Sequence, residues 1–172
     1  MDDALRRIEA KLRDADLRLR KPLDEGRIGA FERRHGVRLP EGYRRFIAEL
    51  GDGGPIPPYG LLPLGRRPKG PLTPEFLRDR QSLPFLASPF PFTRGWITED
   101  GEESDEGEPD QVAHGNLLLG DGGCGIEWRL IVTGPDRGSV WEFCDVGLGP
   151  AEPRRDFLGW YEDRLDRHPT RR

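Results

Sequence analysis

Cysteine and histidine are scarce in this sequence of 172 residues, which contains two cysteines and three histidines. Two cysteines cannot form the set of disulfides that holds small secreted domains together. Cys124 and Cys144 lie on neighbouring predicted strands, so one bridge between them is still conceivable. The three histidines lack the paired spacing that is typical of zinc ligands. We therefore expect free thiols, no metal and no cofactor.

Long apolar runs are also missing. No stretch approaches the ~18 apolar residues that a membrane span requires. The first residues, 1–4, have neither the basic region nor the apolar region of a signal peptide. The sequence therefore predicts a cytoplasmic protein with no membrane partner.

Lysine is rare, because only three of the 27 basic residues are lysines and the others are arginines. The arginines are interleaved with acidic residues along the sequence, and the formal net charge is −4. A nucleic-acid partner needs a basic face that neutralises phosphates. We therefore expect no nucleic-acid partner, and we ascribe the arginine usage to GC-rich coding rather than to recognition.

The composition is polar, with 34% hydrophobic residues, 34% charged residues, 23 glycines and 17 prolines. A chain of this length is one ordinary domain and can bury roughly 70% of its unfolded surface. We therefore expect a single domain over residues 1–172, with a modest core, generous loops and a monomeric state.

Apolar residues recur at helical spacing in four segments, with charged residues between them. These segments are residues 3–20 (within an N-terminal stretch 1–23), 24–36, 40–50 and 154–167. Asp24 is expected to cap the second helix, and Gly36 is expected to end it in a left-handed turn. A shorter helix is expected to begin at Thr73 and Pro74.

A glycine-dense turn from Gly120 to Gly125 separates two apolar runs. A phosphate-binding loop would need Lys followed by Ser or Thr after its last glycine, at the start of a helix. Gly125 is instead followed by residues 126–132, which are rich in β-branched and aromatic side chains and favour a strand. We therefore predict a tight β-hairpin whose glycines adopt positive φ and hold no reactant.

Two further strands are predicted around this hairpin. Residues 139–144 follow it after a turn at 133–138 and complete a three-stranded antiparallel meander. Residues 61–64 form a short strand that Pro63 restricts to a sheet edge or a strand end. Helices first, a mainly antiparallel sheet in the middle and one helix at the end make an α+β fold.

An acidic loop is expected over residues 97–112, and it is the first candidate surface for a partner. It contains eight carboxylates and no basic residue, namely Glu99, Asp100, Glu102, Glu103, Asp105, Glu106, Glu108 and Asp110. Such a loop creates a negative field that can steer a cationic partner. The alternative is a solvated insertion that binds nothing.

The second candidate surface is the proline-interrupted segment 83–96, which has no helical or strand periodicity. Its aromatic residues include Phe90, Phe92 and Trp96. These side chains either fill the core or provide hydrophobic anchors for an interface.

Several of these features occur in the order that is typical of one family. They are Ile28, Phe31-Glu32, Gly36 to Pro40, Tyr43, Phe46-Ile47 and Leu50 to Gly54, then Leu119 to Gly125, Gly138 to Trp141 and Phe157 to Tyr161. In these motifs residues 24–166 resemble the SUKH superfamily, the Smi/Knr-like family of cell-wall-assembly regulators and bacterial immunity proteins. The chain departs from that pattern at Asp52, where asparagine is frequent, and in the length of residues 66–110.

The resemblance implies a non-enzymatic protein-binding role. Bacterial members of this superfamily neutralise cognate toxins, commonly nucleases, in polymorphic toxin systems, and fungal members are regulatory scaffolds. The family supplies no catalytic residue to transfer. Two alternatives stay open: a scaffold that recruits an endogenous partner, and a hydrolase that uses Cys124 or an acidic pair.

Overall fold

The computed structural model describes residues 3–56, 59–66, 82–97, 110–144 and 146–167. Four α-helices, two short 3-10 helices and five strands occur within these ranges. They are α1 (Asp3–Asp14), α2 (Glu25–His35), α3 (Glu41–Glu49), η1 (Leu83–Phe85), β1 (Trp96–Ile97), η2 (Asp110–Ala113), β2 (Asn116–Gly123), β3 (Ile126–Ile131), β4 (Val140–Cys144), β5 (Gly147–Pro150) and α5 (Phe157–Asp166). The predicted α+β fold is confirmed.

The five strands form one sheet in the order β1-β5-β4-β3-β2, and every neighbouring pair is antiparallel. The predicted meander is therefore confirmed as β2, β3 and β4. The sheet continues beyond it, because β5 pairs with β4 and the two-residue strand β1 pairs with β5. The expected strand at residues 61–64 is reduced to one bridge between Leu61 and Gly54.

The predicted hairpin is confirmed, but its turn has only two residues and is shorter than the predicted turn over residues 120–125. Residues 120–123 belong to β2, and Gly120 and Gly122 do not adopt the predicted positive φ. Gly123 pairs with Ile126, so that only Cys124 and Gly125 form the loop, and their φ angles are +53° and +80°. Positive φ at both central residues is the signature of a type I′ turn, which matches the right-handed twist of the strands. A strand begins at Ile126, as predicted, and the amides of this turn do not lead into a helix.

Cys124 is the weak position of this turn, because a side chain with a Cβ atom is strained at positive φ. Replacing Cys124 by glycine is therefore expected to raise the free energy of unfolding by about 0.5–1 kcal/mol. Urea denaturation of both proteins measures this difference. The matched variant Gly125→Ala should lower the free energy of unfolding, and a loss of stability in Cys124→Gly would contradict the account of the turn.

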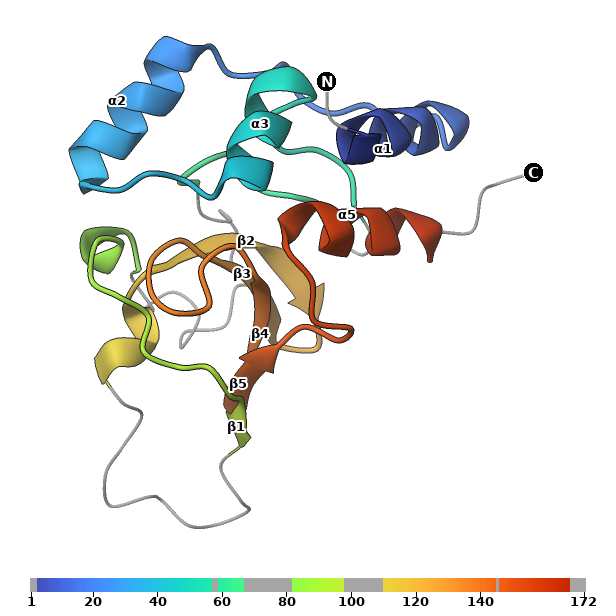
Figure 1. The fold of residues 1–172 in the computed structure, drawn as a ribbon. Coiled ribbons are helices and arrows are strands. Elements are labelled where there is room, and N and C mark those ends of the chain that lie inside the picture. The colour runs from blue at the N-terminus through green and yellow to red at the C-terminus, as the bar shows by residue number, and fades with distance from the viewer. Residues whose placement is uncertain (1–2, 57–58, 67–81, 98–109, 145, 168–172) are drawn as a thin grey trace.

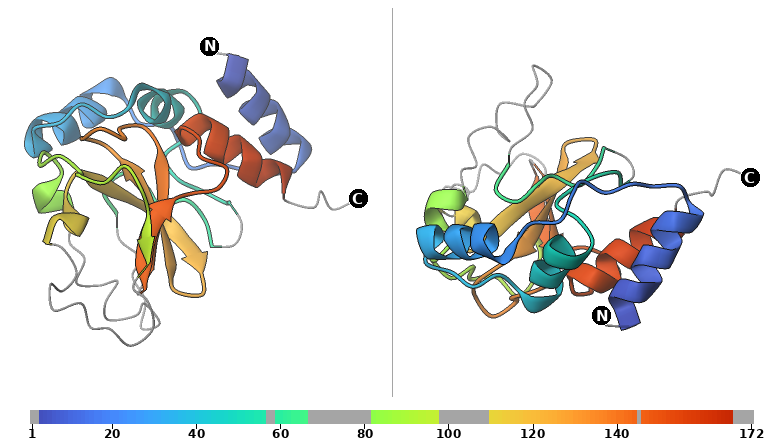
Figure 2. Two further views of the ribbon diagram at one scale, coloured as in Figure 1. Left: turned by 60° about the horizontal axis from the view of Figure 1, so that its bottom comes forward. Right: turned by 90° about the horizontal axis from the view of Figure 1, so that it is seen from above.

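The four α-helices cover one face of the sheet, as Figures 1 and 2 show. Alternate residues of β3, Trp128 and Leu130, are buried in the core between the sheet and the helices. From α3, the ring of Tyr43 lies 4.8 Å from the ring of Phe157 on α5 in an edge-to-face contact. The apolar sides of the helices therefore form one core with this face of the sheet, and α1 joins it by packing against α5.

A second, smaller core lies on the other face of the sheet. Ile131, Trp141 and Phe143 project to this face and are covered by Phe90 and Val112 from the segments before and after residues 98–109. The ring of Phe90 meets that of Trp141 at 4.9 Å and 82°, which is a favourable edge-to-face geometry. Both faces of the sheet are thus buried.

Helix ends follow the local signals where these are strong. Asp24 caps α2 by accepting a hydrogen bond from the Arg27 amide, and Gly36 ends it at φ +64°, as predicted. The predicted helix 3–20 is too long, because α1 ends at Asp14. Residues beyond it turn away, and the Arg20 amide donates to the carbonyl of Gly53 at 2.9 Å. The helix expected from Thr73 lies outside the described residues.

Candidate functional site

Most of the acidic loop, which we predict from the sequence as a binding surface, falls in the range 98–109 that the structure does not describe. Seven of its eight carboxylates, from Glu99 to Glu108, lie outside the described residues. Asp110 is the first residue of η2. The acidic loop therefore stays a prediction.

The aromatic segment is mainly a core element, which corrects one predicted anchor. Phe90 is 0% exposed and packs against Trp141 and Phe143, so its ring faces the second core and no partner. Phe92 is half-buried against Phe90, with the ring centroids 5.2 Å apart. Trp96 on β1 is also half-buried, and its indole N–H has no hydrogen-bond partner among the described residues.

A groove that the sequence does not predict lies along α2. Its volume is about 1110 Å³, and it is lined by Arg20, Lys21, Pro22, Leu23, Arg27, Ala30, Phe31, Arg34, His35, Asp52, Pro63, Leu64, Gly65, Arg66, Leu83 and Pro84. We call it the cation groove, because five of these residues carry a full positive charge and one carries a negative charge.

One wall of the cation groove is a single face of α2. Arg27, Ala30, Phe31 and Arg34 are separated by three or four residues, so that they point to the same side of the helix. Residues 20–23, residues 63–66, and Leu83 with Pro84 supply most of the remaining lining. Three stretches that are far apart in the sequence therefore build one surface.

The five cations are Arg20, Lys21, Arg27, Arg34 and Arg66, and all are exposed. Within the described part of the chain, none of their side chains has a carboxylate partner. The only acidic lining residue, Asp52, accepts a hydrogen bond from the Leu64 amide at 2.7 Å. The groove therefore carries an excess of positive charge, although the whole chain carries −4.

The apolar part of the groove is held in place by specific contacts. The rings of Phe31 and His35 are 4.5 Å apart, and His35 Nδ1 lies 3.2 Å from the carbonyl oxygen of Leu83. Gly65 adopts φ +67°, and a Cβ atom there would come within 2.8 Å of the Phe31 ring. Only glycine fits this approach, so the loop 63–66 packs directly on α2.

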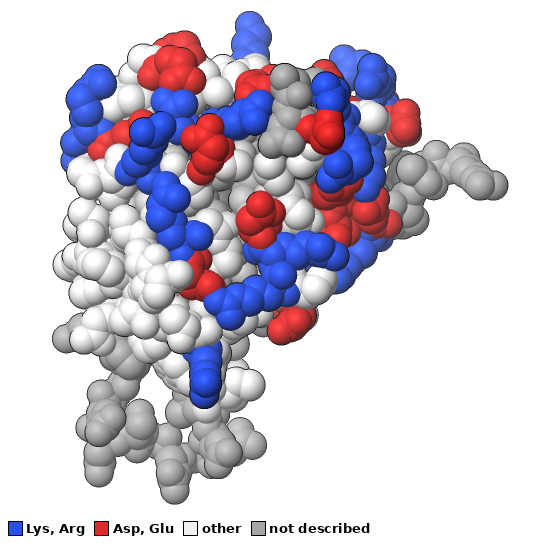
Figure 3. Space-filling view, viewed as in Figure 1, with Lys and Arg blue, Asp and Glu red and all other residues white. Residues whose placement is uncertain are grey.

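Several cations outside the groove are paired with carboxylates. On the face in Figure 3, Lys and Arg side chains alternate with Asp and Glu side chains over the helical part of the molecule. Arg44 contacts both Glu25 and Glu32, with its nearest nitrogens 2.5 Å and 3.3 Å from their oxygens. The cation groove differs from such pairs in gathering five cations and one carboxylate on one surface, with no ion pair among the described residues.

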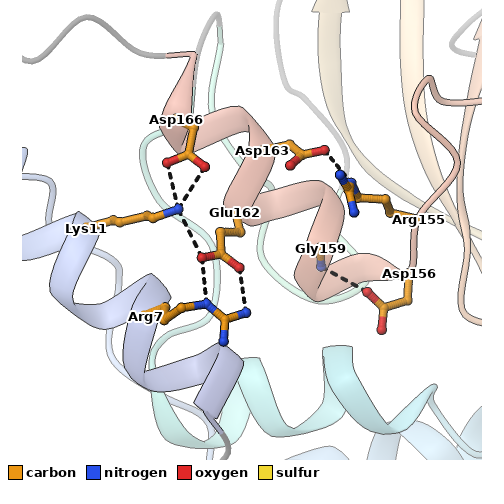
Figure 4. Close-up of polar contacts among 8 residues, drawn as sticks. All are labelled: Arg7, Lys11, Arg155, Asp156, Gly159, Glu162, Asp163 and Asp166. Carbon is orange, nitrogen blue, oxygen red and sulfur yellow. Dashed lines mark hydrogen bonds and ion pairs between the residues drawn. The ribbon is translucent and has the colours of Figure 1, made fainter.

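The best-satisfied of these charge networks joins α1 to α5 (Figure 4). Arg7 donates two hydrogen bonds of 2.9 Å to Glu162, and Lys11 contacts Glu162 and Asp166 at 2.9 Å and 2.6 Å. The hydrogen bonds from Arg7, and then the hydrogen bond and charge of Lys11, lower the pKa of Glu162 to about 2, although burial opposes them. The ionised carboxylate therefore fastens α1 to the rest of the fold.

Replacing Glu162 by glutamine is expected to lower the free energy of unfolding near pH 7 by about 1–2 kcal/mol, since the network is partly open to solvent. The folded-state pKa is below the ordinary value, so the stabilisation is present above about pH 4.5 and is lost as the pH falls toward about 2. Urea denaturation across this range should show the two proteins converging in acid. A difference that is independent of pH would contradict the assignment.

Other chemistry is sparse in the described part of the chain. Neither Cys124 nor Cys144 is part of a disulfide there, so the conceivable bridge between them is not formed. Cys124 is exposed at the hairpin tip, and the Cys144 thiol donates to the Gly147 carbonyl at 3.3 Å. No group of three or more His, Cys, Asp or Glu residues in these ranges is arranged to hold a metal ion.

Comparison with known proteins gives no assignment: no family model, no curated protein and no solved structure significantly matches this chain. None of the helices in the described ranges has the length and apolar character of a membrane span.

The sequence analysis missed the cation groove because its charges are dispersed along the chain. Arg20 and Lys21 precede α2, Arg27 and Arg34 lie on it, and Arg66 follows much later. One signal was present, because Arg27 and Arg34 are seven residues apart and share a helix face. Their convergence with Arg66 depends on the tertiary fold.

Proposed function

We propose that this chain is a non-enzymatic protein-binding module, and most concretely an immunity protein that neutralises a cognate bacterial toxin by direct binding. The observation that carries the binding role is the cation groove. Cations gathered beside apolar side chains are well suited to contact a complementary acidic surface.

The apolar lining of the groove favours a protein as the partner. Leu23, Phe31 and Leu64 are partly or fully withdrawn from solvent and form the apolar part of the groove, with prolines at its edges. Interfaces between proteins combine such an apolar centre with a charged rim. The groove has this arrangement.

The toxin-neutralising role rests on the resemblance to the SUKH superfamily. Its bacterial members are immunity proteins, and a nuclease toxin must carry a basic cleft for its substrate. The acidic loop 97–112 is complementary to such a cleft, and the cation groove offers a second contact surface of the opposite sign. One partner with both acidic and basic regions can engage the two surfaces together.

Co-expression with the product of an adjacent toxin-like gene tests this proposal. We expect the chain to restore growth and to co-purify with the toxin at a fixed stoichiometry. Neutralising Glu102, Glu103, Asp105 and Glu106 together should weaken the complex and flatten its salt dependence if the acidic loop contributes. Unrestored growth together with no complex would contradict the proposed function.

A further inference from the structure

We propose that the cation groove binds an acidic segment of the partner protein, with carboxylates on its rim and at least one apolar side chain on its floor. This inference rests on the proposed protein-binding function and adds the chemistry of the bound segment. It assigns the groove a ligand opposite in charge to the one that the acidic loop would attract.

The charges of the groove favour carboxylates. Arg27 and Arg34 on α2 line the groove together with Arg20, Lys21 and Arg66, and Asp52 is the only carboxylate among the described lining residues. The guanidinium group presents a planar set of donors that matches a carboxylate in a two-bond contact. The described residues supply no carboxylate to these five side chains, so an incoming segment does not have to displace an ion pair formed within the described part of the chain.

The floor distinguishes a peptide from a nucleic acid. Single-stranded nucleic acids bind on exposed aromatic rings along a basic track. Phe31 is the one aromatic ring of phenylalanine, tyrosine or tryptophan type in the lining, and it is half-buried against His35 and beneath Gly65. Leucine and proline make up most of the remaining apolar lining, and they fit aliphatic side chains.

The walls are already in position for binding. The Asp24 cap fixes the start of α2, and backbone hydrogen bonds join Arg20 to Gly53 and Leu23 to Ile47, both at 2.9 Å. Asp52 and Gly65 hold the loop 63–66 through the contacts described above. A preformed groove loses little conformational freedom on binding, so a short segment is sufficient for measurable affinity.

The test uses the full chain and a synthetic peptide in which glutamate and leucine alternate, with a glutamine-leucine peptide as the uncharged probe. Fluorescence anisotropy should show binding of the acidic peptide, no binding of the uncharged peptide, and weaker binding as salt rises from about 50 mM to about 200 mM. The double variant Arg27→Gln/Arg34→Gln should lower the affinity for the acidic peptide about tenfold.

A matched control tests whether the loss of affinity is specific to the groove. Arg33→Gln/Arg38→Gln removes two exposed cations at the same end of the chain that do not line the groove, and its affinity should stay within about twofold of the original. The variant Arg20→Gln/Arg66→Gln changes two lining cations that do not lie on α2, and it should show the same tenfold loss of affinity. The inference would be overturned if the control lost as much affinity for the acidic peptide as the groove variants, or if neither groove variant lost affinity.

Three further outcomes separate failure of the inference from failure of the proposed function. A single-stranded oligonucleotide of the same formal charge that binds more tightly than the acidic peptide would overturn the inference in favour of a nucleic-acid site. A toxin complex that forms equally well with both groove variants would refute the inference and leave the proposed function standing. An acidic peptide that binds as expected, without any toxin complex, would refute the toxin-neutralising function alone.

Discussion

Replacing Arg129 by methionine is expected to lower the free energy of unfolding by about 3–5 kcal/mol. Arg129 on β3 is 1% exposed and pairs with the buried carboxylate of Glu127, at 2.5 Å and 2.8 Å. Its guanidinium also donates to the Asn116 side chain at 2.7 Å and lies 5.1 Å above the Phe143 ring. Methionine would leave Glu127 charged and buried without its partner.

Urea denaturation of the variant measures this loss. The double variant Glu127→Gln/Arg129→Met removes both charges and should be more stable than Arg129→Met alone, because no uncompensated charge is left inside. An exposed control, Arg45→Met, breaks an i,i+4 ion pair of 2.8 Å and should cost less than about 1 kcal/mol. A loss in Arg129→Met no larger than in this control would contradict the buried network.

This network also holds the residues that follow the acidic loop. The Asn116 side chain, which accepts from Arg129, donates to the carbonyl oxygens of Val112 and His114 at 2.7 Å and 2.9 Å. The backbone carbonyl groups of Val112 and His114 are therefore hydrogen-bonded, as polar groups withdrawn from water usually are. Breaking the network should therefore loosen the anchor of residues 110–114 as well as weaken the second core.

Replacing Phe90 by alanine is the second large effect, with an expected loss of about 3–5 kcal/mol. The Phe90 ring is fully buried and makes contacts with Trp141 and Phe143, so its removal leaves a cavity that the surrounding rings cannot fill. Phe92→Ala removes a half-buried ring from the edge of the same cluster and should cost about 1 kcal/mol.

The same pair of variants separates a core residue from a binding residue. Thermal or urea denaturation should show the full loss for Phe90→Ala in the absence of any partner. If Phe90 were instead a surface anchor, the variant would keep its stability and lose affinity only. Unchanged stability in Phe90→Ala would therefore reverse our correction of the sequence-based interpretation.

The parts of this fold that the sequence predicts well depend on local chemistry. The β-hairpin after the glycine-dense segment, the Asp24 cap and the left-handed end at Gly36 each follow from a few neighbouring residues. The alternation in β3 likewise follows from the pleat of a strand, which sends successive side chains to opposite faces. Such features are fixed by the conformational preferences of the residues themselves.

The other features depend on contacts between distant segments. The apolar spacing of α1 continues past Asp14, but the chain leaves the helix because residues 17–23 pack beside residues 47–54. Phe90 lies in a proline-rich stretch without periodicity, so the sequence cannot assign its side chain to the core or to the surface. Arg27, Arg34 and Arg66 are unremarkable charges until the fold brings α2 beside residues 63–66.

Titration of the isotopically labelled full chain with the glutamate-leucine peptide, followed by backbone NMR, tests the central claim most directly. We expect the amide signals of residues 20–23, 27–35 and 63–66 to shift together and to saturate at one affinity, while those of the hairpin turn at Cys124 and Gly125 stay in place. Shifts that occur elsewhere, with the groove signals unchanged, would contradict the assignment of this surface to an acidic partner.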